Sequence, residues 1–262
     1  MRTSLAIATA LVLAACGSAT AHAQPPPAQP VGTPEVEPLP TAPQPLSELV
    51  RPPSRTHGST VARIVAPTFA RARLTGRRRG WPVSPQTAWS AQPQTLLVLD
   101  TATHRGREWV KLRLAVRPNG SAGWVPRDRV ALGQTSYWIE IRTRARVVTI
   151  HRDGKRVRRF RAVVGTPATP TPLGLAAIYE RNRQPNRGGF LGPWAIPLTI
   201  MSNVIENYGG GPGRIGIHGR AGASLADPLG SARSHGCIRI NNHHISWMAA
   251  NIPAGTPVRI RN

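Results

Sequence analysis

The segment Ser234-His235-Gly236-Cys237-Ile238-Arg239, with Ile217-His218-Gly219 upstream of it, is the most informative part of the chain. A thiol is a good nucleophile only as thiolate, and at its ordinary pKa of about 8.5 little of it is ionised at neutral pH. A histidine within hydrogen-bonding reach can take the thiol proton and later return it to a leaving amine. Both His218 and His235 are candidates for that base. The sequence therefore predicts a nucleophilic cysteine with a histidine partner.

The glycines of the two segments add a second indication. Gly219 and Gly236 allow backbone to approach a substrate closely, and N–H groups around Gly236 and Cys237 could bind a developing oxyanion. His235 lies two residues before Cys237, so along an extended strand both side chains point to the same face.

Together the two segments resemble the signature of the L,D-transpeptidase catalytic domain family, which has a His-Gly, a gap of about fifteen residues and then Ser/Thr-His-Gly-Cys. Upstream, Gly165-Thr166 and Thr169-Pro170-Thr171-Pro172-Leu173-Gly174 also resemble a loop of that family. The similarity runs from about Tyr137 to Ile260. It implies that Cys237 is the nucleophile, that His218 is the general base and acid, and that no metal or organic cofactor is needed.

The same resemblance implies roles for the neighbouring residues. The carbonyl of Gly219 would orient the imidazole of the base. His235 would lie in the active-site wall, and its backbone, with those of Gly236 and Cys237, would help form the oxyanion hole. Arg239 fits the commoner form of the motif, and Ser234 is expected to be a turn residue. His244 departs from the family, because many members carry Asp there.

Two other interpretations of Cys237 stay open. A buried structural cysteine behaves as a small hydrophobic residue. Alternatively, His218, His235 and Cys237, with His243 or His244, could bind zinc, since histidine and cysteine are zinc ligands. No carboxylate is placed as an obvious catalytic partner for such a metal, and a zinc peptidase would lose activity with a chelator.

Composition limits the class of protein. The 262 residues contain 34 Lys+Arg and 11 Asp+Glu, a formal net charge of +23. This charge favours polyanionic surroundings, and in an exported protein these would be anionic cell-wall polymers rather than nucleic acid. No apolar run reaches the roughly 20 residues of a membrane-spanning helix, which excludes a multi-span membrane protein.

The N-terminus is predicted to be an export signal over residues 1–23. Leu13-Ala14-Ala15-Cys16-Gly17 resembles the lipobox of bacterial lipoproteins, which makes Cys16 the candidate lipidation site. Ala21-His22-Ala23 offers a competing cleavage site of the small-x-small form. With either cleavage, Cys237 remains as an unpaired thiol, which suggests a reactive group or an intermolecular bridge.

The rest of the chain is predicted to be mainly β. Residues 24–55 are rich in proline and predict a disordered linker. Residues 56–134 predict a small β-barrel module, possibly wall-binding, because Gly106–Leu112 and Gly123–Pro126 resemble bacterial Src-homology-3-like modules. Residues 135–262 form the expected β-rich L,D-transpeptidase-like catalytic domain. Its single helix would begin near Asn241 or Asn242, bury Ile245, Met248, Ala249 and Ile252, and end before Pro253.

The glycine-rich segment 181–213 predicts loops that border a substrate cleft, with Trp194 and Tyr208 as candidate lining residues. For either aromatic residue alone, simple packing is the preferred interpretation.

The predicted function is cell-wall biogenesis in the envelope, either anchored by lipid on the outer face of the cytoplasmic membrane or secreted to the wall. The resemblance implies transpeptidation of peptidoglycan stem peptides, which links their third residues through a cysteine thioester. Three alternatives remain: an L,D-carboxypeptidase or a wall-protein acyltransferase at the same site, or a non-catalytic wall-binding lipoprotein. The membrane would be contacted only through the N-terminal lipid.

Overall fold

The computed structural model describes residues 45–76 and 79–262, and one compact unit holds all of them. The predicted export signal, Cys16 and most of the predicted linker lie outside the described residues. The linker prediction was wrong for its last part. Leu46 and Val50, in and directly after the short helix α1 (Leu46–Leu49), are buried in a hydrophobic cluster with the strands that follow, so the folded unit already includes them.

The first part of the described chain forms a seven-stranded sheet with the order β3-β2-β6-β5-β4-β1-β7. Its hairpin turn at Arg105-Gly106 has both residues at positive φ, as a tight two-residue turn requires. Among the described residues no pairing joins the end strands β3 and β7, and the Src-homology-3-like barrel stays a prediction. The strands are β1 (Ser59–Ile64), β2 (Thr68–Arg71), β3 (Gly80–Val83), β4 (Thr95–His104), β5 (Arg107–Arg113), β6 (Ala122–Pro126) and β7 (Val130–Thr135), with the short 3₁₀ helix η1 (Arg127–Arg129) before β7.

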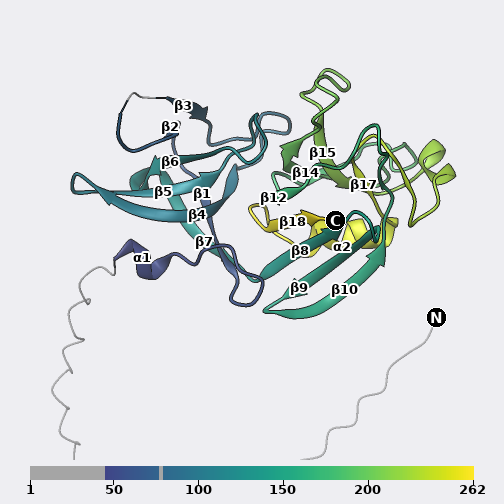
Figure 1. Ribbon diagram of the computed structural model, residues 1–262, viewed down its shortest axis with the longest axis horizontal. Helices are drawn as coiled ribbons and strands as arrows, with labels where there is room; N and C mark the ends of the chain where they lie inside the picture. Colours follow the sequence, from purple (N-terminus) through teal and green to yellow (C-terminus); the bar gives the residue numbers. More distant parts are fainter. Residues whose placement is uncertain (1–44, 77–78) are drawn as a thin grey trace, which may run out of the picture. The chain divides into compact units, whose positions relative to one another are not determined.

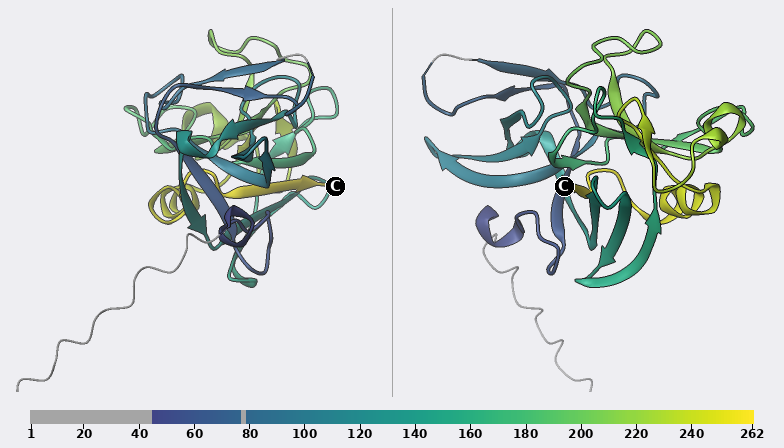
Figure 2. Two further views of the ribbon diagram at one scale, coloured as in Figure 1. Left: turned by 90° about the vertical axis from the view of Figure 1, so that its left-hand side faces the viewer. Right: turned by 45° about the vertical axis from the view of Figure 1, so that its right-hand side comes forward.

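The second part of the chain contains three further sheets (Figure 1). Their orders are β10-β9-β8-β18-β12, β11-β16 and β13-β14-β15-β17. Figure 2 shows these later strands, from teal to yellow, as a group beside the bluer strands of the first sheet. The elements are β8 (Tyr137–Arg142), β9 (Val147–Arg152), β10 (Lys155–Arg161), β11 (Val164–Gly165), β12 (Gly174–Ala177), β13 (Asn182–Arg183), β14 (Trp194–Met201), β15 (Arg214–His218), η2 (Gly222–Ala226), β16 (Ala232–Ser234), β17 (Ile238–Arg239), α2 (Asn242–Asn251) and β18 (Pro257–Arg261).

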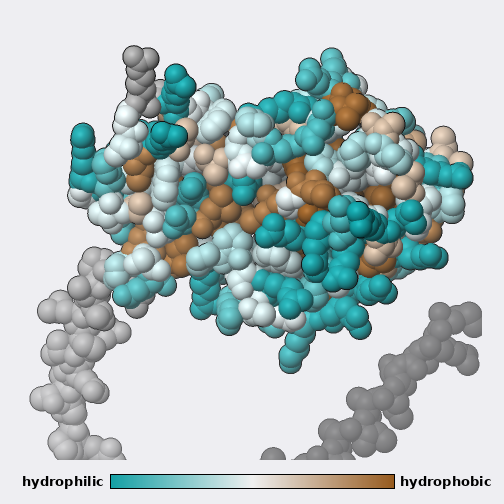
Figure 3. All heavy atoms as spheres, viewed as in Figure 1, coloured by the Kyte–Doolittle hydropathy of each residue, from teal (hydrophilic) through white to brown (hydrophobic). Residues whose placement is uncertain are grey.

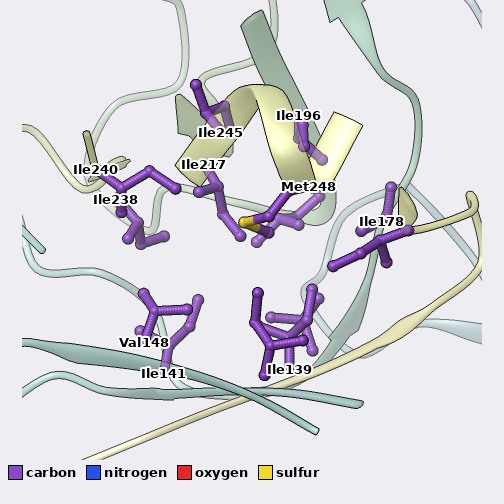
Figure 4. Packing of buried hydrophobic residues seen from close by; sticks show 14 of the residues in the cluster. Ile139, Ile141, Val148, Ile178, Ile196, Ile217, Ile238, Ile240, Ile245 and Met248 are labelled. Atoms are coloured by element: carbon purple, nitrogen blue, oxygen red, sulfur yellow. The ribbon is translucent and has the colours of Figure 1, made fainter. Parts of the chain in front are cut away.

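The core of this second part lies between the five-stranded sheet, the four-stranded sheet and α2. Figure 4 shows Ile139 and Ile141 of β8 facing Ile217 of β15 and Met248 of α2. The alternation of buried and exposed residues along the strands explains this arrangement, because every second side chain of a strand points to the same face. The predicted helix is confirmed, with Asn241 as its N-cap and Ile245, Met248 and Ala249 buried.

The segment 181–213 differs from the prediction of loops alone. Its middle forms β14, an eight-residue strand at the centre of the four-stranded sheet. The glycines that suggested a continuous loop lie on either side of this strand, at 188–192 and 209–213.

Strand β10 carries many basic side chains at the surface. Six of the seven residues of β10 are at least partly exposed, and four of them are arginines. On the face shown in Figure 3, hydrophilic residues cover most of this region, and hydrophobic residues surface in separate patches. None of the helices in the described part of the chain is long and apolar enough to cross a membrane.

Leu198→Ala should lower the free energy of unfolding by about 2–5 kcal/mol, because it removes a fully buried side chain from the core and leaves a cavity. The same substitution at Leu173, whose side chain is half exposed, should change it by less than about 0.5 kcal/mol. Denaturant unfolding of the two variants measures the difference. Equal destabilisation would contradict the assignment of Leu198 to the core.

Candidate active site

Strand pairing brings the two segments of the sequence motif together. β15 runs parallel to β17, with Ile217 paired to Ile238 and His218 paired to Arg239. Cys237 directly precedes β17, so continuation of this register puts it beside Gly216. Ile215 and Ile217 point into the core, and Gly216 and His218 therefore share the opposite face with Cys237.

This face opens into two cavities, both of which are lined by His218 and Cys237. The smaller has a volume of about 50 Å³ and the larger about 280 Å³. Gly216 also lines the larger cavity, and because it has no side chain it leaves space beside the thiol. The candidate nucleophile and base thus face the same open space.

His218 is held in one tautomer. Its ring Nδ1 lies 2.7 Å from the carbonyl oxygen of Gly219. A carbonyl can only accept, so Nδ1 carries the hydrogen and Nε2 keeps its lone pair. Burial is the main reason why the pKa of His218 is lowered to about 4; the Gly219 hydrogen bond opposes this effect, and the charge of Arg239 adds to it. The imidazole is therefore a neutral acceptor at neutral pH.

Cys237 rests as a thiol. Burial raises its pKa, and this effect outweighs a backbone hydrogen bond from Gly216 and the charge of Arg239, both of which lower the pKa. The side chain nevertheless remains partly accessible. The resting pair is thus a neutral thiol and a neutral imidazole, and the thiol needs a base at the moment of attack.

The loop before Cys237 is braced by side-chain hydrogen bonds. Ser234 Oγ donates to the carbonyl oxygen of Cys237 at 2.6 Å and accepts from the N–H of Gly236 at 3.1 Å. Thr171 Oγ1, from the upstream threonine-proline loop, donates to the carbonyl of Gly236 at 2.8 Å. Gly236 has φ +116°, and a Cβ there would lie 2.8 Å from Ile215, so the loop requires glycine.

A second brace holds the backbone that follows His218. The side chain of Asn242, the first residue of α2, accepts from the N–H of Arg220 at 2.7 Å and donates to its carbonyl at 2.9 Å. A Cβ at Gly219 would collide with that amide, which explains the glycine next to the base. The sequence indicates Asn242 only as a possible first residue of the helix and carries no signal for this contact.

Arg239 is a buried cation at the edge of the smaller cavity. It is 4% exposed, pairs with the carboxylate of Asp227, and its guanidinium lies 4.7 Å from the ring centre of Phe190. Phe190 also lies 6.0 Å from the His218 ring, between centroids. Neither Asp227 nor Phe190 carries a local sequence signal that could have identified it.

The remaining histidines do not join the pair in a metal site. His235 is exposed and lines the smaller cavity. His244 stacks on Phe160 with ring centres 4.0 Å apart, and burial lowers its pKa to about 4. Within residues 45–76 and 79–262, no three His, Cys, Asp or Glu side chains converge in a way that could hold a metal ion.

Hydrogen bonds from the first part of the chain hold the connection between β14 and β15, residues 202–213, in place. Arg117 donates to the carbonyls of Ser202, at 2.8 Å, and Pro212, at 3.1 Å. Asn119 exchanges two hydrogen bonds with the backbone of Met201, at 2.7 and 2.8 Å. Tyr208 lies on this connection and lines both cavities.

The other aromatic candidate, Trp194, packs against the core of the second part of the chain. It does not line either of the two cavities at the thiol.

Comparison with known proteins points to one family. Residues 136–260 match the sequence profile of the YkuD family, described as the L,D-transpeptidase catalytic domain. Two curated proteins named for the L,D-transpeptidase YkuD, an assignment that is itself unproven, align over 124 residues. The one from Bacillus licheniformis is 32% identical and the one from Bacillus subtilis strain 168 is 31% identical. Each alignment covers 47% of this chain and 65% of the relative, so the chain matches slightly less than two thirds of each relative.

Solved structures of similar proteins include an L,D-transpeptidase from Mycobacterium smegmatis, with 15% identity and a TM-score of 0.39, covering 63% of this chain and 98% of that one. Another is the L,D-transpeptidase LdtMt1 in complex with imipenem, with 15% identity and a TM-score of 0.40, covering 62% of this chain and 98% of that one.

The buried, neutral His218 should make stability depend on pH. Its pKa is about 4 in the folded protein and about 6.5 when exposed. Between these values the unfolded chain binds more protons, so the free energy of unfolding should fall as the pH is lowered from about 6.5 to about 4. His218→Gln should remove this part of the pH dependence, as measured by denaturant unfolding at several pH values. His244 is present in both proteins, so their difference isolates His218, and parallel pH curves would contradict the assigned burial.

Proposed function

We propose that this chain is a peptidoglycan L,D-transpeptidase that acts through a cysteine thioester, because residues 136–260 match the model of the L,D-transpeptidase catalytic domain. The observation that carries the proposal is the position of Cys237 and His218 on the same two cavities, with Nε2 of the base left free by the Gly219 hydrogen bond.

In the acylation step, Sγ of Cys237 attacks the carbonyl carbon of the third stem residue while its proton passes to Nε2 of His218. The carbon–nitrogen bond to the following D-alanine breaks, and His218 returns the proton to the departing amine. A thioester between Cys237 and the third residue remains. The pKa values suit this sequence of events, because a neutral imidazole can accept the proton of a neutral thiol.

The oxyanion of this step needs backbone donors. The N–H of Gly236 is already given to Ser234 Oγ, so we assign the N–H of Cys237 as the principal donor and His235 to the wall beside it. Ser234 then holds the loop before Cys237 in place. Arg239 contributes its positive charge and its contact with Phe190.

In the second step, the amine of a neighbouring stem's third residue attacks the thioester and loses its proton to His218. The product is a cross-link between two third residues, and Cys237 is regenerated. Water as the acceptor gives an L,D-carboxypeptidase at the same site, and an amine on a wall protein gives an acyltransferase that attaches that protein. Analysis of the acyl acceptor distinguishes the three, whereas a non-catalytic wall-binding lipoprotein should keep its binding after Cys237→Ala.

This activity places the protein in the cell envelope, where stem peptides are found, and the basic surface suits anionic wall polymers. The export signal and lipidation at Cys16 are part of the proposal, since they lie outside the described residues. The residues that carry the chemistry are Cys237 and His218, and neither step requires a metal or organic cofactor.

Cys237→Ala should abolish release of D-alanine from a tetrapeptide stem, and His218→Ala should reduce it by at least about a hundredfold, the contribution of a general base. Mass spectrometry of the peptide products measures both. Thermal unfolding serves as the control for folding. Turnover that survives in Cys237→Ala would contradict the mechanism.

A carbapenem should acylate Cys237, since a β-lactam carbonyl is open to the same attack and the relative LdtMt1 has been solved with imipenem. Intact-protein mass spectrometry should show an adduct in the wild type and none in Cys237→Ala. If the wild type forms no adduct and Cys237 is also inert to iodoacetamide, a buried structural or metal-bound cysteine would be the better account.

A further inference from the structure

Glu180 is a buried carboxylate on the cavity that contains Cys237. It is 2% exposed and lines the larger cavity. One of its oxygens, Oε2, accepts hydrogen bonds from Thr87 Oγ1, at 2.7 Å, and from Ser90 Oγ. Both hydroxyls come from the segment between β3 and β4. The first part of the chain therefore helps to build one end of this cavity.

This carboxylate has no directly bonded cation in the part of the chain that the structure describes. Burial lowers the pKa of Arg214, and the nearby charge of Glu180 opposes this effect. The two terminal nitrogens of Arg214 donate instead to the carbonyls of Leu198 and Ala115, at 3.2 and 3.3 Å. A buried and unpaired carboxylate is costly, so a cation at this position would be bound favourably.

Of the described residues that line either cavity at Cys237, Glu180 is also the only carboxylate. The other charged groups there are Arg214 and Arg239. In a chain with a net charge of +23, the cavity would repel an ammonium group without Glu180.

The sheet places Glu180 in line with the thiol. Pro197 pairs with Gly216, and Gly216 lies beside Cys237 by continuation of the β15–β17 register. On the other side of Pro197, Glu180 lies between Ile178, which pairs with Leu198, and Asn182, which pairs with Ala195. These two pairs differ by one residue in register, so Glu180 lies opposite Ile196 or Pro197 of β14. A row across the sheet therefore runs from Cys237 over Gly216 and β14 to the segment of Glu180, and Cys237, Gly216, Pro197 and Glu180 all line the larger cavity.

The length of this row suits a long aliphatic side chain. Three strand spacings of about 4.8 Å separate the first and last Cα atoms by about 14 Å. An acyl residue on Cys237 with about four methylene groups before its ammonium, together with the side chains of Cys237 and Glu180, can span this distance. Gly216 and Pro197 give it a floor without polar side chains. Trp89 lines the same cavity and lies close to Gly211, where an added Cβ would meet its ring at 3.3 Å.

We propose that Glu180 is a specificity-determining residue that binds the side-chain ammonium of the acyl donor's third residue, and thereby selects donors with a diamino acid at that position. The inference rests on the proposed function and adds to it the recognition of one substrate group. Glu180 takes no part in the proton transfers. Thr87 and Ser90 act as positioning residues, because they fix one carboxylate oxygen and leave the other for the ligand.

The test compares two tetrapeptide donors that differ only in whether the side-chain amine of the third residue is free or acetylated. For the wild type, kcat/KM for D-alanine release should be at least about tenfold higher with the free amine, the factor expected for one charge-assisted hydrogen bond. Glu180→Gln should remove this preference, lowering kcat/KM for the free amine and leaving the acetylated donor within about twofold. The amide oxygen can still accept from Thr87 and Ser90, which keeps the packing.

Glu206→Gln is the matched control, since it removes the same charge from an exposed residue that lines neither cavity. It should keep the wild-type preference. Equal use of both donors by the wild type would overturn the inference, and this result does not depend on whether the variant folds. A preference for the free amine that is unchanged in Glu180→Gln would overturn it as well. If the wild type releases D-alanine from neither donor, the proposed function fails and the inference falls with it.

Discussion

The parallel pairing of β15 with β17 is the constraint on which the site depends. Two residue pairs, Ile217 with Ile238 and His218 with Arg239, fix the position of Cys237 relative to the base. The isoleucines of both strands are fully buried, so the hydrophobic core holds the register. A shift by one residue would turn His218 into the core and Ile217 into the cavity, because side chains alternate between the two faces of a strand. The packing of these isoleucines in the core thus fixes the position of His218 relative to Cys237.

The environment created by this packing also determines the protonation states. Burial of His218 and Cys237 disfavours the charged form of each, so the pair rests neutral, and the Gly219 carbonyl decides which ring nitrogen is free. The hydrogen bonds of Ser234, Thr171 and Asn242 restrict the backbone on either side of the pair. A nucleophile held in this way loses little conformational entropy when it attacks.

The sequence predicted the parts of the molecule that have local signals. The Cys237 motif and the helix over 242–251 are encoded by neighbouring residues or by short periodicities. β14 was missed because glycine-rich segments flank it on both sides. Leu46 and Val50 fall within the predicted linker because the proline-rich composition of residues 24–55 outweighs the short apolar pattern of Leu46, Leu49 and Val50.

The contacts of Glu180 and Arg117 could not be predicted from the sequence, for a different reason. Each joins residues about ninety positions apart, and only the folded structure brings them together. The same contacts show that the first part of the chain contributes to the cavity, which neither its composition nor its resemblance to a separate module had indicated.

The central claim is that Cys237 carries the acyl group between donor and acceptor. Rapid acid quenching of the enzyme with a tetrapeptide stem and no amine acceptor, followed by intact-protein and peptide mass spectrometry, tests it most directly. The account predicts a transient mass increase equal to the donor without its D-alanine, located on the peptide that contains Cys237. Steady release of D-alanine with no acyl group on Cys237, and undiminished by prior alkylation of that thiol, would contradict it.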